Sequence, residues 1–193
     1  SKGNVISPLD LIKNQGAENL RLWAILEDYR NDVNFSMESL ERVSETYRKI
    51  RNTIRFLLGN LFDFNPDTDS VSLSQSGNLD RWALSRSEDV FEKIRKAYDN
   101  YEFHQVYHLL VNYCGVELSS VYFDILKDRL YTAAKKSTER KSSQTAMFLI
   151  AQGLLKSLAP ILPYTAEEAW RYLPAYKDKE DSIFLTDYHP FKG

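Results

Sequence analysis

The sequence predicts an all-α fold: a helical bundle of about four long helices, preceded by a short helical N-terminal segment. Apolar residues recur at spacings of three and four along several long stretches, which places them on one face of a helix. Gly and Pro are scarce, with 7 and 6 copies in 193 residues, and this favours long regular elements over turn-rich β-structure. With 43% hydrophobic residues, the chain can form one sizeable core.

The N-terminal segment is predicted to contain two short helices. Ser7 followed by Pro8 is a helix start signal, because Ser suits the N-cap and Pro suits the first helical position. Gly16 is expected to end this helix. A second helix is predicted over about residues 17–26, and residues 28–34 are predicted to form a loop.

Two long amphipathic helices are predicted next. Ser36 can cap the first, in which apolar residues recur at helical spacing until about residue 61. Residues 67–78 form a polar loop rich in Ser and Asp. The second long helix is predicted over about residues 78–98. Its core-facing residues are expected to be Leu79, Trp82, Ala83, Val90, Ile94 and Ala97.

The second half of the sequence predicts two more long helices. The third covers about residues 103–133, with Gly115 as a kink or a close-packing point. The fourth covers about residues 142–158 and ends before a proline. Thr165 and Glu168 have the spacing of a capping box, which predicts that a short helix starts at Thr165. Residues 183–185 are expected to be extended.

Composition excludes several classes of protein. A net charge of −2 excludes a wholly basic nucleic-acid binder, although it leaves room for a local basic stripe. A single cysteine, Cys114, can form neither an internal disulfide nor a cysteine-based zinc site, and its apolar neighbours predict a buried, inert thiol. The sequence shows no signal peptide and no 18-residue apolar run, so we expect a cytoplasmic protein without a membrane partner.

The first long helix carries a cluster of basic residues. Arg48, Lys49, Arg51 and Arg55 occur in a stretch, residues 47–61, that contains no acidic residue. The three arginines share one face at helical spacing, and Asn52 adds a neutral donor and acceptor. Guanidinium groups can each bond two phosphate oxygens, so this face is suited to an RNA backbone. The alternative is that the arginines pair with acidic residues of neighbouring helices.

Two further segments could contact RNA. Residues 127–141 have a local charge balance of +4, for which the alternative is a solvated helix end. Arg81, at a helix start, could face solvent or stack on a base. The negative charge of Asp80 near the helix N-terminus interacts favourably with the helix dipole. Trp82 is expected in the core. The basic residues of the longer segment are Lys127, Arg129, Lys135, Lys136, Arg140 and Lys141.

Catalytic motifs are missing from the sequence. His104 and His108 have chelating spacing, but no third ligand is evident, so we expect no metal site. There is no GxSxG, Walker or GxGxxG motif, and no nucleophile–base set, so no catalytic residue is predicted. The residues alone therefore indicate a helical interaction domain. Its basic face could bind RNA or dock an acidic protein.

Several segments resemble class I aminoacyl-tRNA synthetases. Ser1-Lys-Gly-Asn-Val-Ile-Ser-Pro8 is similar to the sequence after the KMSKS loop of the isoleucine, valine and leucine enzymes, with Ser1 as the last signature residue. The stretch from Tyr47 to Asn60, containing Arg-Asn-Thr, looks specifically like the isoleucine enzymes. So do Leu79-Asp-Arg-Trp82, Tyr101-Glu-Phe-His104, Tyr122-Phe-Asp-Ile-Leu-Lys-Asp-Arg-Leu-Tyr131, Leu158-Ala-Pro-Ile-Leu-Pro163 and Thr165-Ala-Glu-Glu-Ala-Trp170.

The resemblance implies a tRNA partner and a parent isoleucine–tRNA ligase. Residues 1–36 would contain the end of the catalytic loop and a stem-contact segment, and residues 37–193 the anticodon-binding bundle with an extended tail. Ser1 would border the ATP site, while tRNA contacts are expected from Arg48, Arg51, Asn52, Arg55 and Arg81. A valine or leucine ligase fragment is the alternative within the family.

Compared with the whole enzymes that it resembles, this sequence lacks several parts. The HIGH signature, the nucleotide-binding fold, the editing domain and a cysteine-rich zinc tail are missing from these 193 residues. ATP with Mg would belong to the whole enzyme, and we expect this chain alone to bind no cofactor and to be inactive. Its expected partners are tRNA and the catalytic domain of the same polypeptide, with no DNA, and we expect a monomer.

Overall fold

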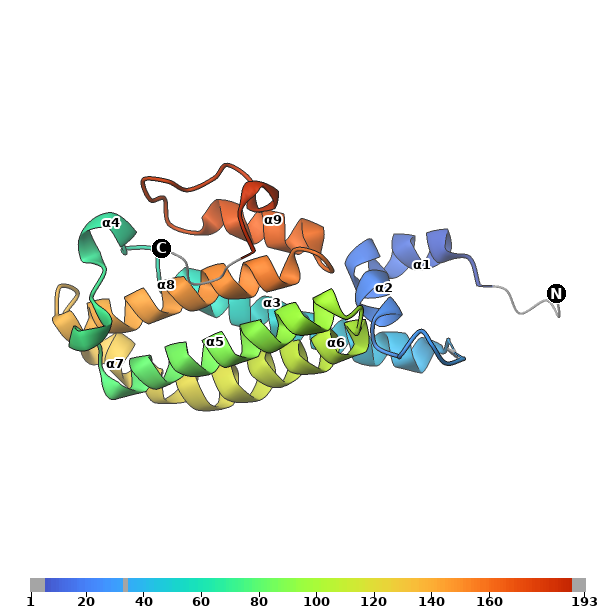
Figure 1. Cartoon of the computed structure of the whole chain (residues 1–193), viewed down its shortest axis with the longest axis horizontal. Helices are drawn as coiled ribbons and strands as arrows, with labels where there is room; N and C mark the ends of the chain where they lie inside the picture. Colours follow the sequence, from blue (N-terminus) through green and yellow to red (C-terminus); the bar gives the residue numbers. More distant parts are fainter. Residues whose placement is uncertain (1–5, 33–34, 189–193) are drawn as a thin grey trace.

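The computed structural model describes residues 6–32 and 35–188, and helices are the regular elements throughout this part of the chain (Figure 1). The prediction of an all-α bundle with a short helical N-terminal segment is confirmed. The elements are α1 (Pro8–Gln15), α2 (Ala17–Ala24), α3 (Met37–Gly59), α4 (Pro66–Asp69), η1 (Leu73–Gln75), α5 (Asn78–Asp99), α6 (Phe103–Asn112), η2 (Tyr113–Tyr122), α7 (Phe123–Thr132), α8 (Thr138–Leu158), α9 (Pro163–Tyr172) and η3 (Ile183–Leu185).

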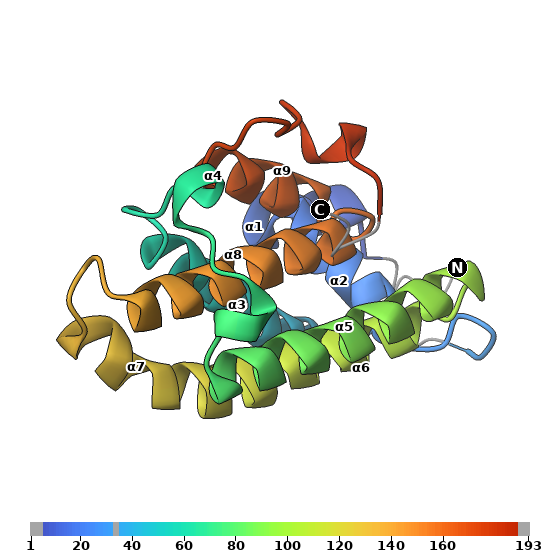
Figure 2. The same cartoon turned by 60° about the vertical axis from the view of Figure 1, so that its left-hand side comes forward.

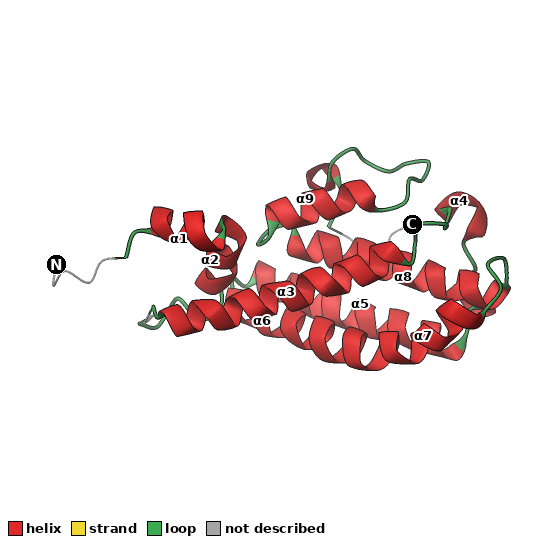
Figure 3. Cartoon of the chain, turned by 180° about the vertical axis from the view of Figure 1, so that it is seen from behind, coloured by secondary structure: helices red, strands yellow, loops and turns green. Residues whose placement is uncertain are grey.

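The long helices lie side by side in an elongated bundle. Helix α8 packs against α3, α5 and α7, and α9 covers its other side (Figures 1 and 2). Helices α1 and α2 lie at one end of the bundle, where α2 contacts α3 and α9. Helix α4 and the loop between α7 and α8 lie at the opposite end. Seen from behind, α3 runs in front, between α9 above and α6 below (Figure 3).

Helix α8 is the centre of the core. It is buried on nearly all sides, including positions with small side chains such as Ala146, Gly153 and Ser157. A helix that is buried all round belongs in the interior of a domain, and small residues let its neighbours approach closely. The large side chains of Trp170, Tyr113, Tyr122 and Phe91 are fully buried around it.

The third long helix is continuous from α6 to α7 and has an unusual middle. Residues of η2 form a π-helix, in which the hydroxyls of Ser119 and Ser120 donate to the carbonyls five residues earlier, at 2.6 and 3.0 Å. Gly115 lies in this stretch, and a Cβ built there would meet no heavy atom within 4 Å. Close packing at Gly115 was therefore a wrong prediction, and the irregularity is a wider turn.

By length and composition alone, the helix from Phe103 to Thr132 could cross a membrane. In the structure it is one helix of the bundle, and it packs against α3, α5 and α8. Its inner face buries Leu110 and Leu126, whereas Asp124 and Lys127 form an exposed ion pair on the outer side. This distribution is typical of an amphipathic bundle helix.

Three local predictions were wrong. Helix α8 begins at Thr138, four residues before the predicted start, because the hydroxyl of Ser137 accepts from the backbone N–H of Arg140. Trp82 is 44% exposed, since the helical phase of α5 turns Asp80 into the core instead. Residues 183–185 form a 3₁₀ turn, η3, rather than an extended segment.

The start of α9 also differs from the predicted capping box. Helix α9 begins at Pro163, and its first turn receives no side-chain cap from its own N-cap residue. Instead the carboxylate of Glu18, on α2, accepts from the backbone N–H groups of Tyr164 and Thr165 at 3.4 and 3.2 Å. The Thr165 hydroxyl bonds to the Tyr47 hydroxyl at 2.8 Å. Glu168 is therefore not used as a capping residue.

Candidate nucleic-acid interface on helix α3

The exposed side of α3 is strongly basic. Arg48, Lys49, Arg51, Asn52 and Arg55 are all exposed, and together they form what is here called the basic face. Arg48, Arg51 and Arg55 follow one another at spacings of three and four, so their side chains leave the helix in similar directions. The sequence prediction that these residues share one solvent-facing side is confirmed.

The core holds the basic face in place from beneath. Ile50 and Leu57 are 1% and 0% exposed, so α3 is anchored along its length. Thr53, which lies between Asn52 and Ile54, bonds to the carbonyl of Cys114 and to the hydroxyl of Ser119 on the π-helix. These contacts fix the direction of the helix and therefore the side of the protein on which the basic side chains lie.

The basic side chains form no ion pair with any residue that the structure describes. Within residues 6–32 and 35–188, no ion pair involves Arg48, Lys49, Arg51 or Arg55. The alternative, pairing with acids of neighbouring helices, is wrong for the described chain. Four like charges without counterions on one helix face attract anions, and polyanions most of all.

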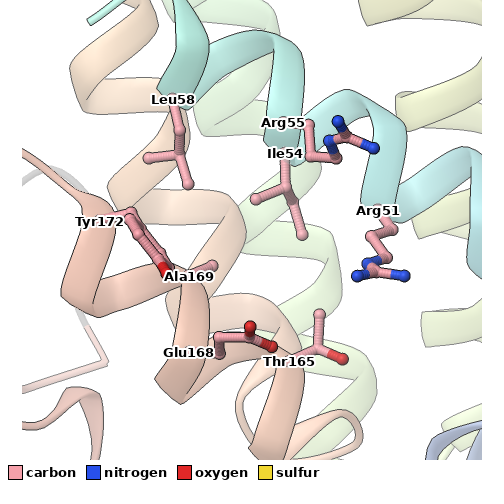
Figure 4. A pocket seen from close by; sticks show the side chains of 8 residues that line it. All are labelled: Arg51, Ile54, Arg55, Leu58, Thr165, Glu168, Ala169 and Tyr172. Atoms are coloured by element: carbon pink, nitrogen blue, oxygen red, sulfur yellow. The ribbon is translucent and has the colours of Figure 1, made fainter. Parts of the chain in front are cut away.

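A groove lies on the α9 side of the basic face. It has a volume of about 210 Å³, and we call it the α9 groove. Figure 4 shows the side chains of Arg51 and Arg55 leaving α3 on one wall, with Glu168 and Tyr172 on the α9 wall. Tyr172 is 72% exposed. The groove therefore combines cations, a carboxylate and an accessible aromatic ring.

A second, larger groove lies on the other side of α3. It has a volume of about 810 Å³ and runs between α3 and the π-helix, so we call it the π-helix groove. Lys49 and Asn52 form one wall, and His108, Ser119 and Ser120 contribute polar groups to the other. The basic face is thus a ridge between two grooves. An extended polymer could contact the ridge and enter either groove.

The other predicted contact residues lie elsewhere. Arg81 is exposed at the N-terminus of α5, where its guanidinium donates to the Asn78 side chain, and neither groove includes it. Helix α5 is in front in Figure 1, whereas α3 is in front in Figure 3. Ser1, the predicted ATP-site neighbour, lies outside the described residues.

The second basic segment is mostly used to hold the protein together. Arg129 pairs with Asp80 at 3.0 Å, Arg140 with Asp63 at 3.2 Å, and Lys141 with Asp69. The expected alternative, a solvated helix end, is wrong for these three residues, because they already have protein counterions. Among the basic residues of this segment, Lys135 and Lys136, at the tip between α7 and α8, are exposed and form no ion pair with a described residue.

Sequence reasoning missed a polar cluster inside the bundle. The carboxylate of Asp80 has no exposed surface and accepts from Tyr122 at 3.0 Å, Ser142 at 2.7 Å and Arg129 at 3.0 Å. The Ser143 hydroxyl lies within 3.4 Å of the same carboxylate. The cluster joins α5, the π-helix, α7 and α8. No short-range pattern reveals it, because its members are 42 to 63 residues from Asp80.

No site for metal chemistry was found in the described chain. Its His, Cys, Asp and Glu residues form no group of three that could hold a metal ion. Cys114 is fully buried, and burial raises the pKa of its thiol to about 12, so the thiol stays protonated at neutral pH.

Comparison with known proteins gives three consistent findings. Residues 80–192, more than half of the chain, match the family model described as the anticodon-binding domain of tRNA ligase. The chain is 54% identical over 174 residues to an isoleucine–tRNA ligase of Symbiobacterium thermophilum, covering 90% of the chain and 19% of that protein. It is 49% identical over 188 residues to an isoleucine–tRNA ligase of Coxiella burnetii, covering 97% of the chain and 20% of that protein.

The fold also matches a solved structure. A chain from the crystal structure of the Agrobacterium radiobacter K84 LeuRS–tRNA–LeuAMS ternary complex superposes with a TM-score of 0.60 at 15% identity. The match covers 96% of the present chain and 22% of that chain. At this identity the likeness concerns the fold. The present chain spans about a fifth of the length of the curated relatives that it matches.

Proposed function

The chain belongs to the family of the anticodon-binding domain of tRNA ligases, and from this membership we propose that it binds tRNA through the basic face of α3. The observation that carries the proposal is the set of four exposed cations without a protein counterion in the described chain. An anchored helix with such a face suits a ribose-phosphate backbone. Each guanidinium can bond two phosphate oxygens, and each neutralised phosphate releases counterions.

The grooves beside the ridge support the same proposal. Backbone contacts position an RNA, whereas bases are read where single strands splay out. The α9 groove and the π-helix groove each offer polar side chains directly beside the cations. We assign the phosphate contacts to Arg48, Arg51 and Arg55, a neutral contact to Asn52, and a separate contact at the end of the bundle to Arg81.

We further propose that the parent protein is an isoleucine–tRNA ligase, which joins isoleucine to its tRNA with ATP and Mg. Identities of about 50% to proteins of that name support this over a valine or leucine ligase. In this proposal the present chain supplies tRNA contacts, while the catalytic domain of the same polypeptide supplies the chemistry. The N-terminal residues 1–36 would lead from that domain, with Ser1 at its ATP site, and residues 37–193 would form the anticodon-binding part. The cytoplasm is the proposed location, and neither DNA nor a membrane is a proposed partner.

A tRNA titration tests the proposed function. The 193-residue chain is titrated with cognate and non-cognate anticodon stem-loops at two salt concentrations, and the same is done with Arg51→Glu. We expect binding that weakens with salt and falls by at least about tenfold in the variant, because the substitution reverses a charge at the contact. Equal affinity for every polyanion, including heparin, would instead favour an acidic protein as the partner of this face.

A further inference from the structure

Opposite charges line the α9 groove without pairing with one another. Arg51 and Arg55 on α3 and Glu168 on α9 all contribute to it, yet no ion pair joins them in the part of the chain that the structure describes. Glu168 is available because Glu18, from α2, already caps the first turn of α9. The groove thus presents two cationic donors and one anionic acceptor, all exposed to solvent.

A carboxylate in this place disfavours a simple phosphate ligand. Its negative charge repels phosphate oxygens and weakens the attraction of the two arginines. The arrangement suits a ligand that brings an anion to the arginines and an N–H donor to the carboxylate. Tyr172 lies on the same wall and is 72% exposed, and its ring offers such a ligand a flat apolar surface.

We propose that the α9 groove holds one nucleotide of single-stranded RNA whose base carries an exocyclic amino group. The base stacks on Tyr172, its amino group donates to Glu168, and the adjoining phosphate meets Arg51 and Arg55 (Figure 4). This assignment rests on the proposed function, because it makes the α9 groove part of the same RNA contact. It adds a preference for bases with an exocyclic amino group to a face that otherwise recognises only the negative charge of the backbone.

The preference follows from donor and acceptor geometry. Cytosine presents an amino donor where uracil presents a carbonyl oxygen, and an ionised carboxylate can only accept. Cytosine therefore gains a charge-assisted hydrogen bond at Glu168, whereas uracil places two acceptors against one another. The two pyrimidines have similar ring size, so a difference between them reports on the amino group rather than on stacking area.

The test compares 12-nucleotide oligo(C) and oligo(U) RNAs binding to the whole 193-residue chain at pH 7.5 and low salt. We expect oligo(C) to bind about three- to tenfold more tightly than oligo(U). Glu168→Ala should remove this difference by weakening oligo(C), while oligo(U) binds as before or more tightly because its carbonyl no longer faces a carboxylate. Glu88→Ala is the matched control, because it removes an exposed carboxylate from a different helix, α5. It should change neither affinity. If Glu168→Ala tightens both RNAs equally, the carboxylate only repels phosphate and the inference is overturned.

Substitutions at Tyr172 test the stacking part of the inference. Tyr172→Phe keeps the ring and should bind both RNAs as the unsubstituted chain does, while Tyr172→Ala should weaken both by at least about fivefold. Unchanged binding in Tyr172→Ala would overturn the stacking assignment. Loss of the proposed function has a different signature, in which neither RNA binds measurably or Arg51→Glu leaves binding unchanged. RNA binding that depends on Arg51 but is indifferent to Glu168 would overturn the nucleotide site alone.

Discussion

The carboxylate of Asp80 and the guanidinium of Arg129 join α5 to α7 through an ion pair of 3.0 Å, in which the carboxylate is fully buried and the Arg129 side chain is 31% exposed. Ser142 and Tyr122 complete the hydrogen bonding of the carboxylate from two further elements. Removing one partner of a buried pair is unfavourable, because the remaining charge and hydroxyls lose their acceptor.

Asp80→Ala should therefore lower the free energy of unfolding by about 2–4 kcal/mol, the lower part of this range reflecting the partial solvation of Arg129. Asp80→Asn, which keeps one acceptor oxygen, should have a smaller effect. Urea denaturation followed by circular dichroism measures both. Arg95→Gln, which breaks only exposed ion pairs to Glu92 and Asp99, serves as control and should leave the midpoint unchanged. An Asp80→Ala midpoint equal to that of the control would show that the cluster does not stabilise the bundle.

Neutralising the arginines of the basic face should reduce the salt dependence of RNA binding. Single Gln substitutions at Arg48, Arg51 and Arg55 are each expected to lower the slope of log K against log salt concentration by about 0.7–0.9, because one phosphate contact is lost. Fluorescence anisotropy at several salt concentrations gives the slopes. Lys93→Gln, at an exposed cation of α5, is the control with an unchanged slope. If all three arginine variants keep the original slope, RNA does not contact α3 through phosphates.

Loss of the Glu18 carboxylate should loosen the start of α9. Glu18→Ala is expected to lower the free energy of unfolding by about 1 kcal/mol, the usual effect of losing a helix N-cap. Glu18→Gln retains an acceptor oxygen, so its free energy of unfolding should lie between those of the unsubstituted chain and of Glu18→Ala. Amide hydrogen exchange locates the effect, since the N–H groups of Tyr164 and Thr165 lose their acceptor. Glu27→Ala, at an exposed glutamate, is the control. If the two amides are as well protected in Glu18→Ala as in the unsubstituted chain, Glu18 does not cap α9.

The thiol of Cys114 should resist modification in the native protein. Burial raises its pKa to about 12 from an ordinary value near 9, and the side chain is out of contact with solvent. At pH 8 a disulfide reagent should label it only after urea unfolding. Because the folded-state pKa is the higher one, this group's contribution to stability is intact below about pH 9 and is lost as pH rises toward 12. Native labelling at the unfolded rate would contradict the burial.

Helix positions and the exposed basic face could be predicted because their signals are local. Apolar spacing along residues 37–59 fixes which side of α3 enters the core, and that in turn sends Arg48, Arg51 and Arg55 outward. The Ser36 cap was equally readable, and the structure adds a reciprocal bond in which the backbone N–H of Ser36 donates to the Ser39 hydroxyl. The same locality explains why the bounds of α5 agree closely with the sequence prediction.

Features built from distant residues could not be predicted. The cap of α9 comes from Glu18, 147 residues before Thr165, so a local capping box at Thr165 was the wrong interpretation. Asp80 was interpreted only as a favourable residue at a helix start, so its role as a hydrogen-bond acceptor in the core was missed. For the same reason Trp82 was predicted on the core side of α5, whereas it is exposed. The pairing of Arg129, Arg140 and Lys141 likewise depended on acids 49 to 77 residues away.

The unpaired ridge of α3 links the melting behaviour of the protein to its ionic surroundings. Mutual repulsion among Arg48, Lys49, Arg51 and Arg55 opposes the folded state most strongly when little salt is present, because the screening length is then long. Any anion that gathers along the ridge binds the folded form in preference to the unfolded chain, and so raises the unfolding temperature by mass action. We therefore expect the chain to be more heat-resistant with a polyanion bound than alone.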